Sequence, residues 1–322
     1  MQEIPDSCAE SYGIPCALSA YSCSGDEMKK FLSLLFVLLF AALLLIHPKD
    51  AGAAVQEGFA LCAQTVVPSL FPFFVVAALL LRLGLDSVLR PLCAPFMRPL
   101  FRLRGECAAP LLAGFLGGYP TGARSAAQLY EQGALTRGEA ELLLGFCNNC
   151  GVGFLVGFVG AGIFGSVRMG ILLLTVHIVS ALLSGAVLCR MMRPSEKAPV
   201  LSCRLPAQNA SFSGAFVASV SGAVASTLTV CAYVVFFGTV TALVPMPGAL
   251  SGAVEMVGAI AALEADTVGF AAASGITAWG GLSVHCQTMA VAGDLSLRYH
   301  TVGKILQTVF AVIVSGIACW IF

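Results

Sequence analysis

GFLGGYPTGARS, residues 114–125, and FCNNCG, residues 146–151, each interrupt an apolar segment with glycine and polar side chains. The glycines and Pro120 predict that one half-helix ends here and that a second begins near Thr121. A backbone that leaves helical geometry at membrane depth is tolerated only where protein or a water-filled cavity satisfies its freed amide and carbonyl groups. The two breaks therefore mark a candidate solute site, in an arrangement typical of secondary transporters.

The composition indicates a membrane protein. Hydrophobic residues make up 58% of the 322 residues and charged residues only 11%, with a formal net charge of zero. So few charges cannot coat a soluble globule, and a neutral chain gives no indication of a nucleic-acid partner. The predicted fold class is an all-α integral membrane protein, and the expected surroundings are a lipid bilayer.

Residues 1–27 show no apolar periodicity and are expected to be an unstructured extension. Met28-Lys29-Lys30 before the apolar run to Ile46 is typical of a natural start, so the extension is interpreted as a mis-called beginning. Residues 28–50 are predicted to form a leading transmembrane helix. The same run also fits a signal peptide that would be cleaved near Ala51–Ala53. We favour the retained helix.

Two repeats are predicted to follow, residues 51–204 and 205–322. The segment starting at Ser226, STLTVCAYVVFFGTVTAL, aligns with the segment starting at Pro68, PSLFPFFVVAALLLRLGL, at a constant offset of 226 − 68 = 158. Each repeat predicts a span, a re-entrant hairpin, a broken span and a closing span. The hairpins are expected at residues 106–135 and 248–265, and the second is interrupted by Glu255 and Gly258. The spans, seven with the leading helix, are expected at about 28–50, 66–83, 136–162, 169–191, 226–243, 267–292 and 302–322.

Two further local signals help to place the broken spans. Thr136 with Glu139 three residues later is a capping-box pattern and predicts a helix start. Trp279-Gly280-Gly281 breaks the sixth span as CNNCG breaks the third.

Three crossings per repeat are an odd number, so the second repeat is predicted to be inverted relative to the first. Charge placement gives the same orientation independently. With the N-terminus in the cytoplasm, all 17 Lys and Arg residues except Lys49 and Arg168 fall on or near the cytoplasmic side. The positive-inside rule and the inverted repeat therefore agree. The hairpins then enter from opposite faces, and their tips are expected to converge near the midplane.

GGYPTGAR, FCNNCG, the EMVG stretch and WGGLSVHCQ together resemble the sporulation integral membrane proteins of the YlbJ type. These proteins contain paired nucleoside-recognition (gate) domains and are related to concentrative nucleoside transporters. The resemblance covers roughly residues 31–322. It implies movement of dipicolinic acid from the mother cell across the outer forespore membrane during sporulation. The family more often has asparagine where Val257 stands here.

A small planar dianion needs positive potential, which half-helix N-termini supply through backbone donors and partial charge. Arg124 is a candidate for a bidentate guanidinium contact. Its alternative is a snorkelling or interface arginine. Asn148 and Asn149 are expected either to contact the solute or to satisfy broken backbone. The full set of predicted solute-binding residues is Gly118, Tyr119, Thr121, Gly122, Arg124, Asn148, Asn149, Gly281, Ser283, His285 and Gln287.

Glu255 is the candidate site for a coupling proton or cation, because an intramembrane acid is a functional-site hypothesis by default. Its alternative is a structural hydrogen-bonding residue near the outer surface. His285 and Gln287 follow the second break and are candidates for solute contact or proton transfer. His177, alone in the middle of the fourth span, is expected to be a packed histidine.

The alternatives to a transporter of dipicolinate are a transporter of nucleosides or other small metabolites and a non-transporting membrane scaffold. The CNNC motif has the spacing of a redox or zinc pair, but no second pair or nearby histidine completes a site. We interpret its cysteines as packing residues. The sequence has no G-x-S-x-G elbow and no P-loop, so no catalytic residue, metal or cofactor is predicted. A homo-oligomer is compatible with the sequence.

Overall fold

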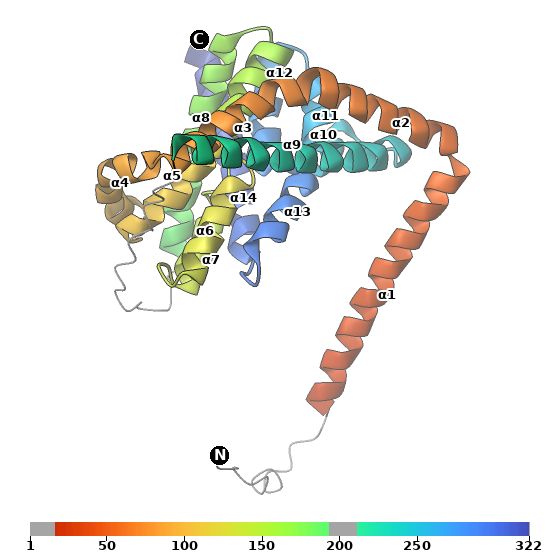
Figure 1. Ribbon diagram of the computed structural model, residues 1–322. Coiled ribbons are helices and arrows are strands. Elements are labelled where there is room, and N and C mark those ends of the chain that lie inside the picture. Colours follow the sequence, from red (N-terminus) through yellow and green to blue (C-terminus); the bar gives the residue numbers. More distant parts are fainter. Residues whose placement is uncertain (1–16, 193–210, 322) are drawn as a thin grey trace, which may run out of the picture. The chain divides into compact units, whose positions relative to one another are not determined.

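The computed structural model describes residues 17–192 and 211–321 (Figure 1). Within these two ranges every regular element is a helix. Two compact units divide the chain, residues 1–51 and residues 52–322, and each is described by itself. The α-helices are α1 (Ala17–Ile46), α2 (Pro48–Leu61), α3 (Val67–Arg82), α4 (Leu85–Phe96), α5 (Ala108–Gly117), α6 (Thr121–Glu131), α7 (Arg137–Leu144), α8 (Val167–Met191), α9 (Phe212–Leu243), α10 (Gly248–Val254), α11 (Met256–Ala261), α12 (Thr267–Trp279), α13 (Gly281–Ala292) and α14 (Arg298–Ile321). The described residues also form three π-helices, η1 (Cys62–Val66), η2 (Met97–Phe101) and η4 (Gly153–Ile163), and one 3₁₀-helix, η3 (Gly105–Cys107).

The first unit contains α1, which corrects one expectation. The helix begins at Ala17, so residues 17–27, predicted to be unstructured, are helical, while residues 1–16 lie outside the described part. Large apolar side chains along α1, such as Phe31 and Phe36, are exposed. Such a surface is typical of a helix that faces lipid.

Four helical runs among the described residues are long and apolar enough to cross a membrane. They are Pro48–Arg82, Val167–Met191, Phe212–Leu243 and Arg298–Trp320. They contain the predicted second, fourth and fifth spans and most of the last. Two of them are longer than predicted, because the stretches at 52–64 and 211–225 continue the following span without a break. The total of seven spans remains a prediction.

The predicted breaks fall where the sequence placed them. The first hairpin turns at Gly118–Pro120, and its second half, α6, begins at Thr121. Residues 148–151, between α7 and η4, belong to no helix. In the second half of the chain, Glu255 separates α10 from α11, and Gly280 separates α12 from α13. Gly258 does not interrupt α11, which corrects that detail.

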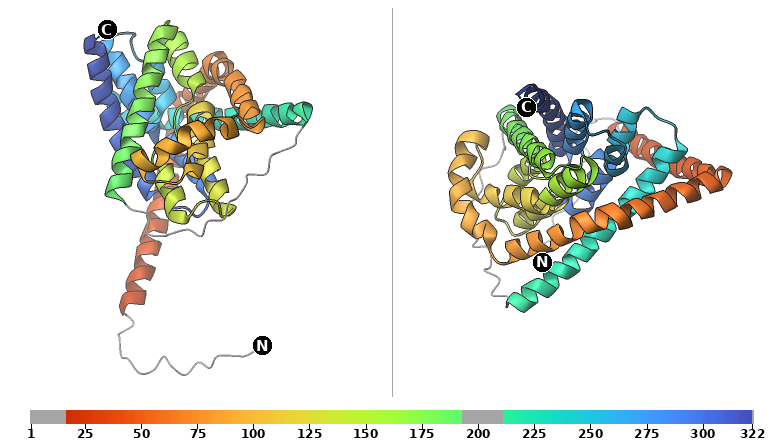
Figure 2. Two further views of the ribbon diagram at one scale, coloured as in Figure 1. Left: turned by 90° about the vertical axis from the view of Figure 1, so that its left-hand side faces the viewer. Right: turned by 90° about the horizontal axis from the view of Figure 1, so that it is seen from above.

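The long helices of the second unit pack against one another in two groups. α14 lies between α8 and α12 and packs closely against both (Figure 2). α3 and α9 pack against one another and cross at an angle (Figure 2). At the interruptions themselves, Tyr119, Glu255 and Ser283 are buried, so the points where the helices break lie inside the second unit.

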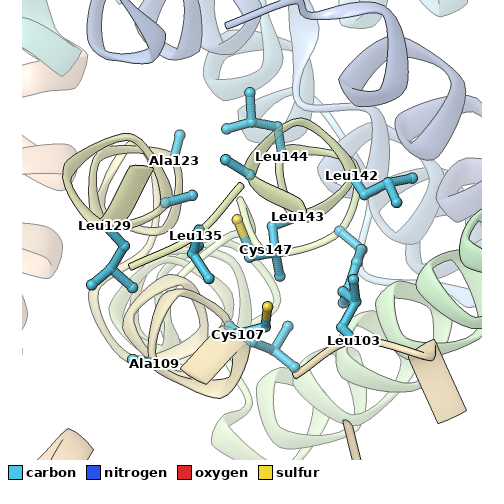
Figure 3. Packing of buried hydrophobic residues seen from close by; sticks show 14 of the residues in the cluster. Leu103, Cys107, Ala109, Ala123, Leu129, Leu135, Leu142, Leu143, Leu144 and Cys147 are labelled. Atoms are coloured by element: carbon cyan, nitrogen blue, oxygen red, sulfur yellow. The ribbon is translucent and has the colours of Figure 1, made fainter. Parts of the chain in front are cut away.

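One of two buried apolar clusters surrounds the first hairpin and the start of the third span. Cys147 lies among Leu143, Leu135 and Cys107 in this cluster (Figure 3). The capping box predicted at the start of this span is present: Thr136 Oγ1 accepts from the Glu139 amide, and the Glu139 carboxylate accepts from the Thr136 amide. Arg104 also donates to both carboxylate oxygens of Glu139, at 2.7 and 2.5 Å, and so ties the preceding loop to α7.

Candidate functional site

A cavity opens in the second unit where the two hairpin tips meet. Gly118 and Tyr119 from the first tip line it together with Met256 and Val257 from the second. The segments that follow the two breaks, residues 150–154 and the start of α13, complete its inner wall, and α3 and α9 form its outer wall. All four interrupted segments therefore contribute to one space, as the sequence predicts for the tips.

The cavity is small and mostly apolar. Its volume of about 40 Å³ holds a few water molecules. Phe73 and Phe74 of α3 and Val234 of α9 supply much of the apolar wall, and the polar side chains that reach it include Tyr119, Ser283 and Gln287. A solute larger than water therefore needs the cavity to widen.

Glycine sets the geometry of the first break because backbones meet there without room for side chains. Gly118 has a φ of 71°, in the left-handed region that favours glycine, and its backbone contacts that of Gly151. A Cβ atom at Gly114 or Gly122 would overlap the carbonyl oxygen of Cys147. The first hairpin thus seats directly on the backbone between α7 and η4.

The second break is built differently. Glu255 caps α11, with Oε1 accepting from the Val257 amide at 2.8 Å and Oε2 from the Gly258 amide at 2.5 Å. Gly280, with a φ of 88°, ends α12, and Gly281 contacts the backbone of Val254. The second hairpin tip and the break between α12 and α13 therefore support one another.

A chain of buried polar side chains lies behind the first tip. Lys304 of α14 donates from Nζ to the Tyr119 hydroxyl at 2.8 Å and to Gln307 Oε1 at 2.9 Å. Gln307 Nε2 donates in turn to Asn149 Oδ1 at 3.0 Å and lies 3.3 Å from His177 Nε2. These hydrogen-bonded side chains connect the first tip, the first break, α8 and α14.

His177 belongs to this chain and is more than a packed histidine. Its Nε2 accepts a hydrogen bond from the Cys150 backbone amide at 3.2 Å, which satisfies a donor freed by the break. A neutral ring that accepts at Nε2 carries its proton on Nδ1. The expectation of a merely packed side chain was therefore incomplete.

The predicted solute-binding residues fall into two groups. Gly118, Tyr119, Ser283 and Gln287 line the cavity. The others hold the surrounding backbone or lie apart from it: Thr121, Gly122, Arg124, Asn148, Asn149, Gly281 and His285.

Arg124 is the clearest departure from the prediction. It is exposed on α6 and does not line the cavity. α6 is amphipathic, with Ala123, Ala126 and Ala127 buried, and this pattern turns Arg124 to its outer face.

Asn148, Asn149 and His285 are buried or half-buried next to the breaks. Asn149 Nδ2 donates to the Phe146 carbonyl at 2.7 Å, so this side chain satisfies broken backbone, one of its two expected roles. Asn148 Nδ2 donates to Thr288 Oγ1 at 2.6 Å. The His285 ring lies 4.5 Å from that of Trp279, between centroids, instead of facing the cavity.

Lys304 was not among the predicted site residues. The positive-inside rule counts it with the basic residues near the cytoplasmic face, yet its side chain is 0% exposed. The signal that would have found it is its place inside the predicted last span, because an intramembrane lysine is a functional-site hypothesis in the same way as Glu255.

The CNNC cysteines are both buried. Cys147 lies in the apolar cluster around the first hairpin, and Cys150 Sγ lies 4.0 Å from Met256 Sδ and 3.5 Å from the Thr277 carbonyl oxygen. Both side chains act as small packing residues, and that of Cys150 joins the first break to the second hairpin.

Together, these features define a class: an integral membrane protein of α-helices in which broken helices and hairpin tips enclose a buried cavity. Comparison with known proteins identifies the family. The model of the nucleoside recognition (Gate) family matches residues 63–249, more than half of the chain. The chain belongs to the nucleoside recognition (Gate) family.

The chain is also similar to a curated protein, the sporulation integral membrane protein YlbJ of Bacillus subtilis (strain 168). The two are 34% identical over 162 residues, which is 50% of this chain and 40% of that relative. This similarity confirms the resemblance to proteins of the YlbJ type. The matched stretch spans about two fifths of the length of that relative. No solved structure matches the chain.

Proposed function

We propose that this chain is a secondary transporter that carries a small anionic solute across the membrane through the cavity between the hairpin tips. One observation carries the proposal: both tips and both helix breaks contribute to the same cavity. Irregular backbone at membrane depth is tolerated where it lines such a space. A scaffold needs no such convergence.

Transport requires the cavity to open alternately to the two faces. The order of elements supports an inverted repeat that would do this: a long helix, an interrupted hairpin, a broken helix and a second long helix occur in each half. The volume of about 40 Å³ fits a conformation closed around the solute path. Rocking of one repeat against the other is the expected mechanism.

Dipicolinic acid during sporulation is the solute we favour, with the outer forespore membrane as its location. The relative's printed name supports sporulation, and the resemblance to the YlbJ type supports dipicolinate. The buried cation Lys304, close to the cavity, supports an anion. We place Gly118, Tyr119, Ser283 and Gln287 at the solute, and we retain Glu255 as a candidate coupling site in addition to its role as a helix cap.

A nucleoside is the second candidate solute, because the family model that matches is named for nucleoside recognition. A neutral nucleoside would use the aromatic wall of Phe73 and Phe74 and the polar groups of Ser283 and Gln287. It would have no use for a buried cation.

Uptake by proteoliposomes separates these candidates. The purified chain is reconstituted, and labelled dipicolinate and labelled uridine are supplied with and without a proton gradient. We expect saturable uptake of dipicolinate above that of empty liposomes. Uptake of uridine alone would favour the second candidate, and uptake of neither would favour a scaffold.

A further inference from the structure

We propose that Lys304 is the counter-ion of the transported solute, so that the site selects an anionic carboxylate over an uncharged molecule of similar shape. The inference rests on the proposed function and adds the residue that determines the class of solute. It follows from the surroundings of Lys304, which give a buried cation only neutral partners.

Burial is the first step. Lys304 and Gln307 are both 0% exposed, and Tyr119 is 7% exposed. The Lys304 Nζ atom also lies 5.0 Å from the centroid of the Tyr119 ring, close enough for a cation–π contact. An ammonium group held in this way has exchanged water for a hydroxyl, an amide oxygen and an aromatic face.

The second step is the absence of a negative charge. Among the residues that the structure describes, no carboxylate lies within ion-pair distance of Lys304. The titratable groups around its amine are one phenol, two thiols and three imidazoles: Tyr119, Cys147, Cys150, His177, His285 and His300. Without an ionic partner a buried amine is costly to keep protonated, so an arriving anion stabilises its charged form.

The third step is a free donor. An ammonium group has three N–H bonds. Within the described ranges, two of them have acceptors, Tyr119 Oη and Gln307 Oε1. A carboxylate oxygen can therefore be added to the present partners or can replace the tyrosine hydroxyl.

The fourth step links Lys304 to the cavity. Tyr119 lines the cavity and accepts from Lys304, so one side chain separates the ammonium group from the solute space. Gln287 also lines the cavity and is 4% exposed, and its Oε1 atom has no hydrogen-bond partner among the described residues. A buried polar atom left open on the cavity wall points to a ligand, and widening of the cavity brings the ligand towards Lys304.

The consequence is a preference for anions. A carboxylate that reaches Nζ gains a charge-assisted hydrogen bond, whereas an amide or a hydroxyl of the same shape leaves the ammonium group unneutralised. The hydrogen bonds that connect Gln307 to Asn149 and His177 hold the lysine in place.

The test measures binding by the purified full-length protein and by three variants. The probes are pyridine-2,6-dicarboxylate, its uncharged diamide and uridine. Their binding is measured by isothermal titration calorimetry in detergent. K304M removes the charge at nearly constant volume, and K304Q removes the charge but leaves a polar group. R124M is the matched control, because it removes a positive charge from an exposed position on the neighbouring hairpin.

We expect K304M and K304Q to weaken binding of the dianion by about ten- to hundredfold and to leave the weak binding of the diamide unchanged. R124M should bind the dianion within about threefold of the parent, as expected for an exposed charge. K304Q should unfold at about the same temperature as the parent, because it removes a buried charge that lacks an ionic partner and keeps a donor for Gln307. K304M should unfold at a lower temperature than K304Q, because it leaves Gln307 Oε1 buried without its donor.

Three results would overturn the proposal, and they differ in whether the proposed transport function also fails. If the parent binds the dianion and the Lys304 variants bind it equally well, Lys304 is not the counter-ion but the proposed function stands. If both Lys304 variants unfold at a clearly lower temperature, the lysine is structural. If the parent binds no dianion, the anionic solute class fails as well.

Discussion

Asn148 and Asn149 are adjacent and both fully buried, but their hydrogen bonds differ. Asn149 spans the first break: it donates to the Phe146 carbonyl and accepts from Gln307. Asn148 donates to Thr288, and its Oδ1 atom has no partner among the described residues. The two side chains therefore contribute differently to the polar chain that ends at Lys304.

Replacing Asn149 with leucine should abolish dipicolinate uptake and lower stability. The substitution leaves the Phe146 carbonyl and the Gln307 amide buried without partners, at a cost of about 1–3 kcal/mol for each group. It also releases Gln307, which orients Lys304. Uptake by proteoliposomes and thermal unfolding in detergent measure the two effects.

Asn148→Leu is the control for this prediction, because it breaks one hydrogen bond instead of two and leaves the Lys304 chain intact. It should lower stability less than Asn149→Leu and retain uptake. Equal effects of the two substitutions would show that the connection to Lys304 does not matter.

At the scale of residues, the sequence predicted which polar groups lie near the breaks but not which of them face the cavity. Tyr119, Ser283 and Gln287 line it, whereas Arg124 is exposed on α6 and does not. Lys304 comes close through the packing of α14 against α7 and α8. A contact between residues 185 positions apart, as between Tyr119 and Lys304, depends on tertiary packing that local patterns do not contain.

At the scale of elements, the close approach of α5 to the interrupted third span depends on glycine. Gly114→Ala should destabilise the protein by about 1–3 kcal/mol, since the added methyl group would overlap the backbone carbonyl of Cys147 and rigid backbone must shift. Unfolding by heat in detergent gives the difference. Uptake should fall with it, because the same contact positions the first tip.

Gly222→Ala in α9 is the matched control. It is also a glycine within a helix, but a Cβ atom there would meet nothing within 4 Å. Higher helix propensity should make this variant as stable as the parent or more stable, by up to about 1 kcal/mol. If Gly114→Ala behaves like Gly222→Ala, the hairpin does not seat on the third span as described.

The breaks in the helices were predictable because they are local. Gly118, Glu255 and Gly280 each end or cap a helix through their own backbone or side-chain chemistry. The length of α9 was not predicted, because residues 211–225 contain no proline and their two glycines, Gly214 and Gly222, do not interrupt the helix. Where a continuous helix meets the membrane surface is not encoded in its local helix propensity.

At the scale of the whole molecule, the inverted repeat makes a prediction about sidedness. The N-terminus and the connecting segments 82–104, 190–204 and 293–301 should be cytoplasmic, and the C-terminus should lie outside. A thiol introduced by Arg98→Cys should react with an impermeant reagent only from the cytoplasmic face, and one introduced by Arg168→Cys only from the outer face. Both positions are exposed.

These labelling experiments use a background in which the reactive native cysteines have been replaced. The orientation follows from the positive-inside rule together with an odd number of crossings per repeat. Labelling of the Arg98 position from the outer face would contradict the inverted arrangement, even if every helix boundary were correct.

The central claim is that the solute passes through the cavity between the two hairpin tips, and one measurement tests it most directly. S283C places a thiol on the cavity wall, on the helix that follows the second break. Proteoliposomes that contain S283C or the parent are treated with a charged methanethiosulfonate, with and without excess unlabelled dipicolinate, and uptake of labelled dipicolinate is then measured. We predict that the reagent blocks uptake by S283C but not by the parent, and that dipicolinate present during treatment protects S283C. Mass spectrometry establishes whether the introduced thiol has been modified. If it has been modified and uptake by S283C is unchanged, the solute does not pass through this cavity.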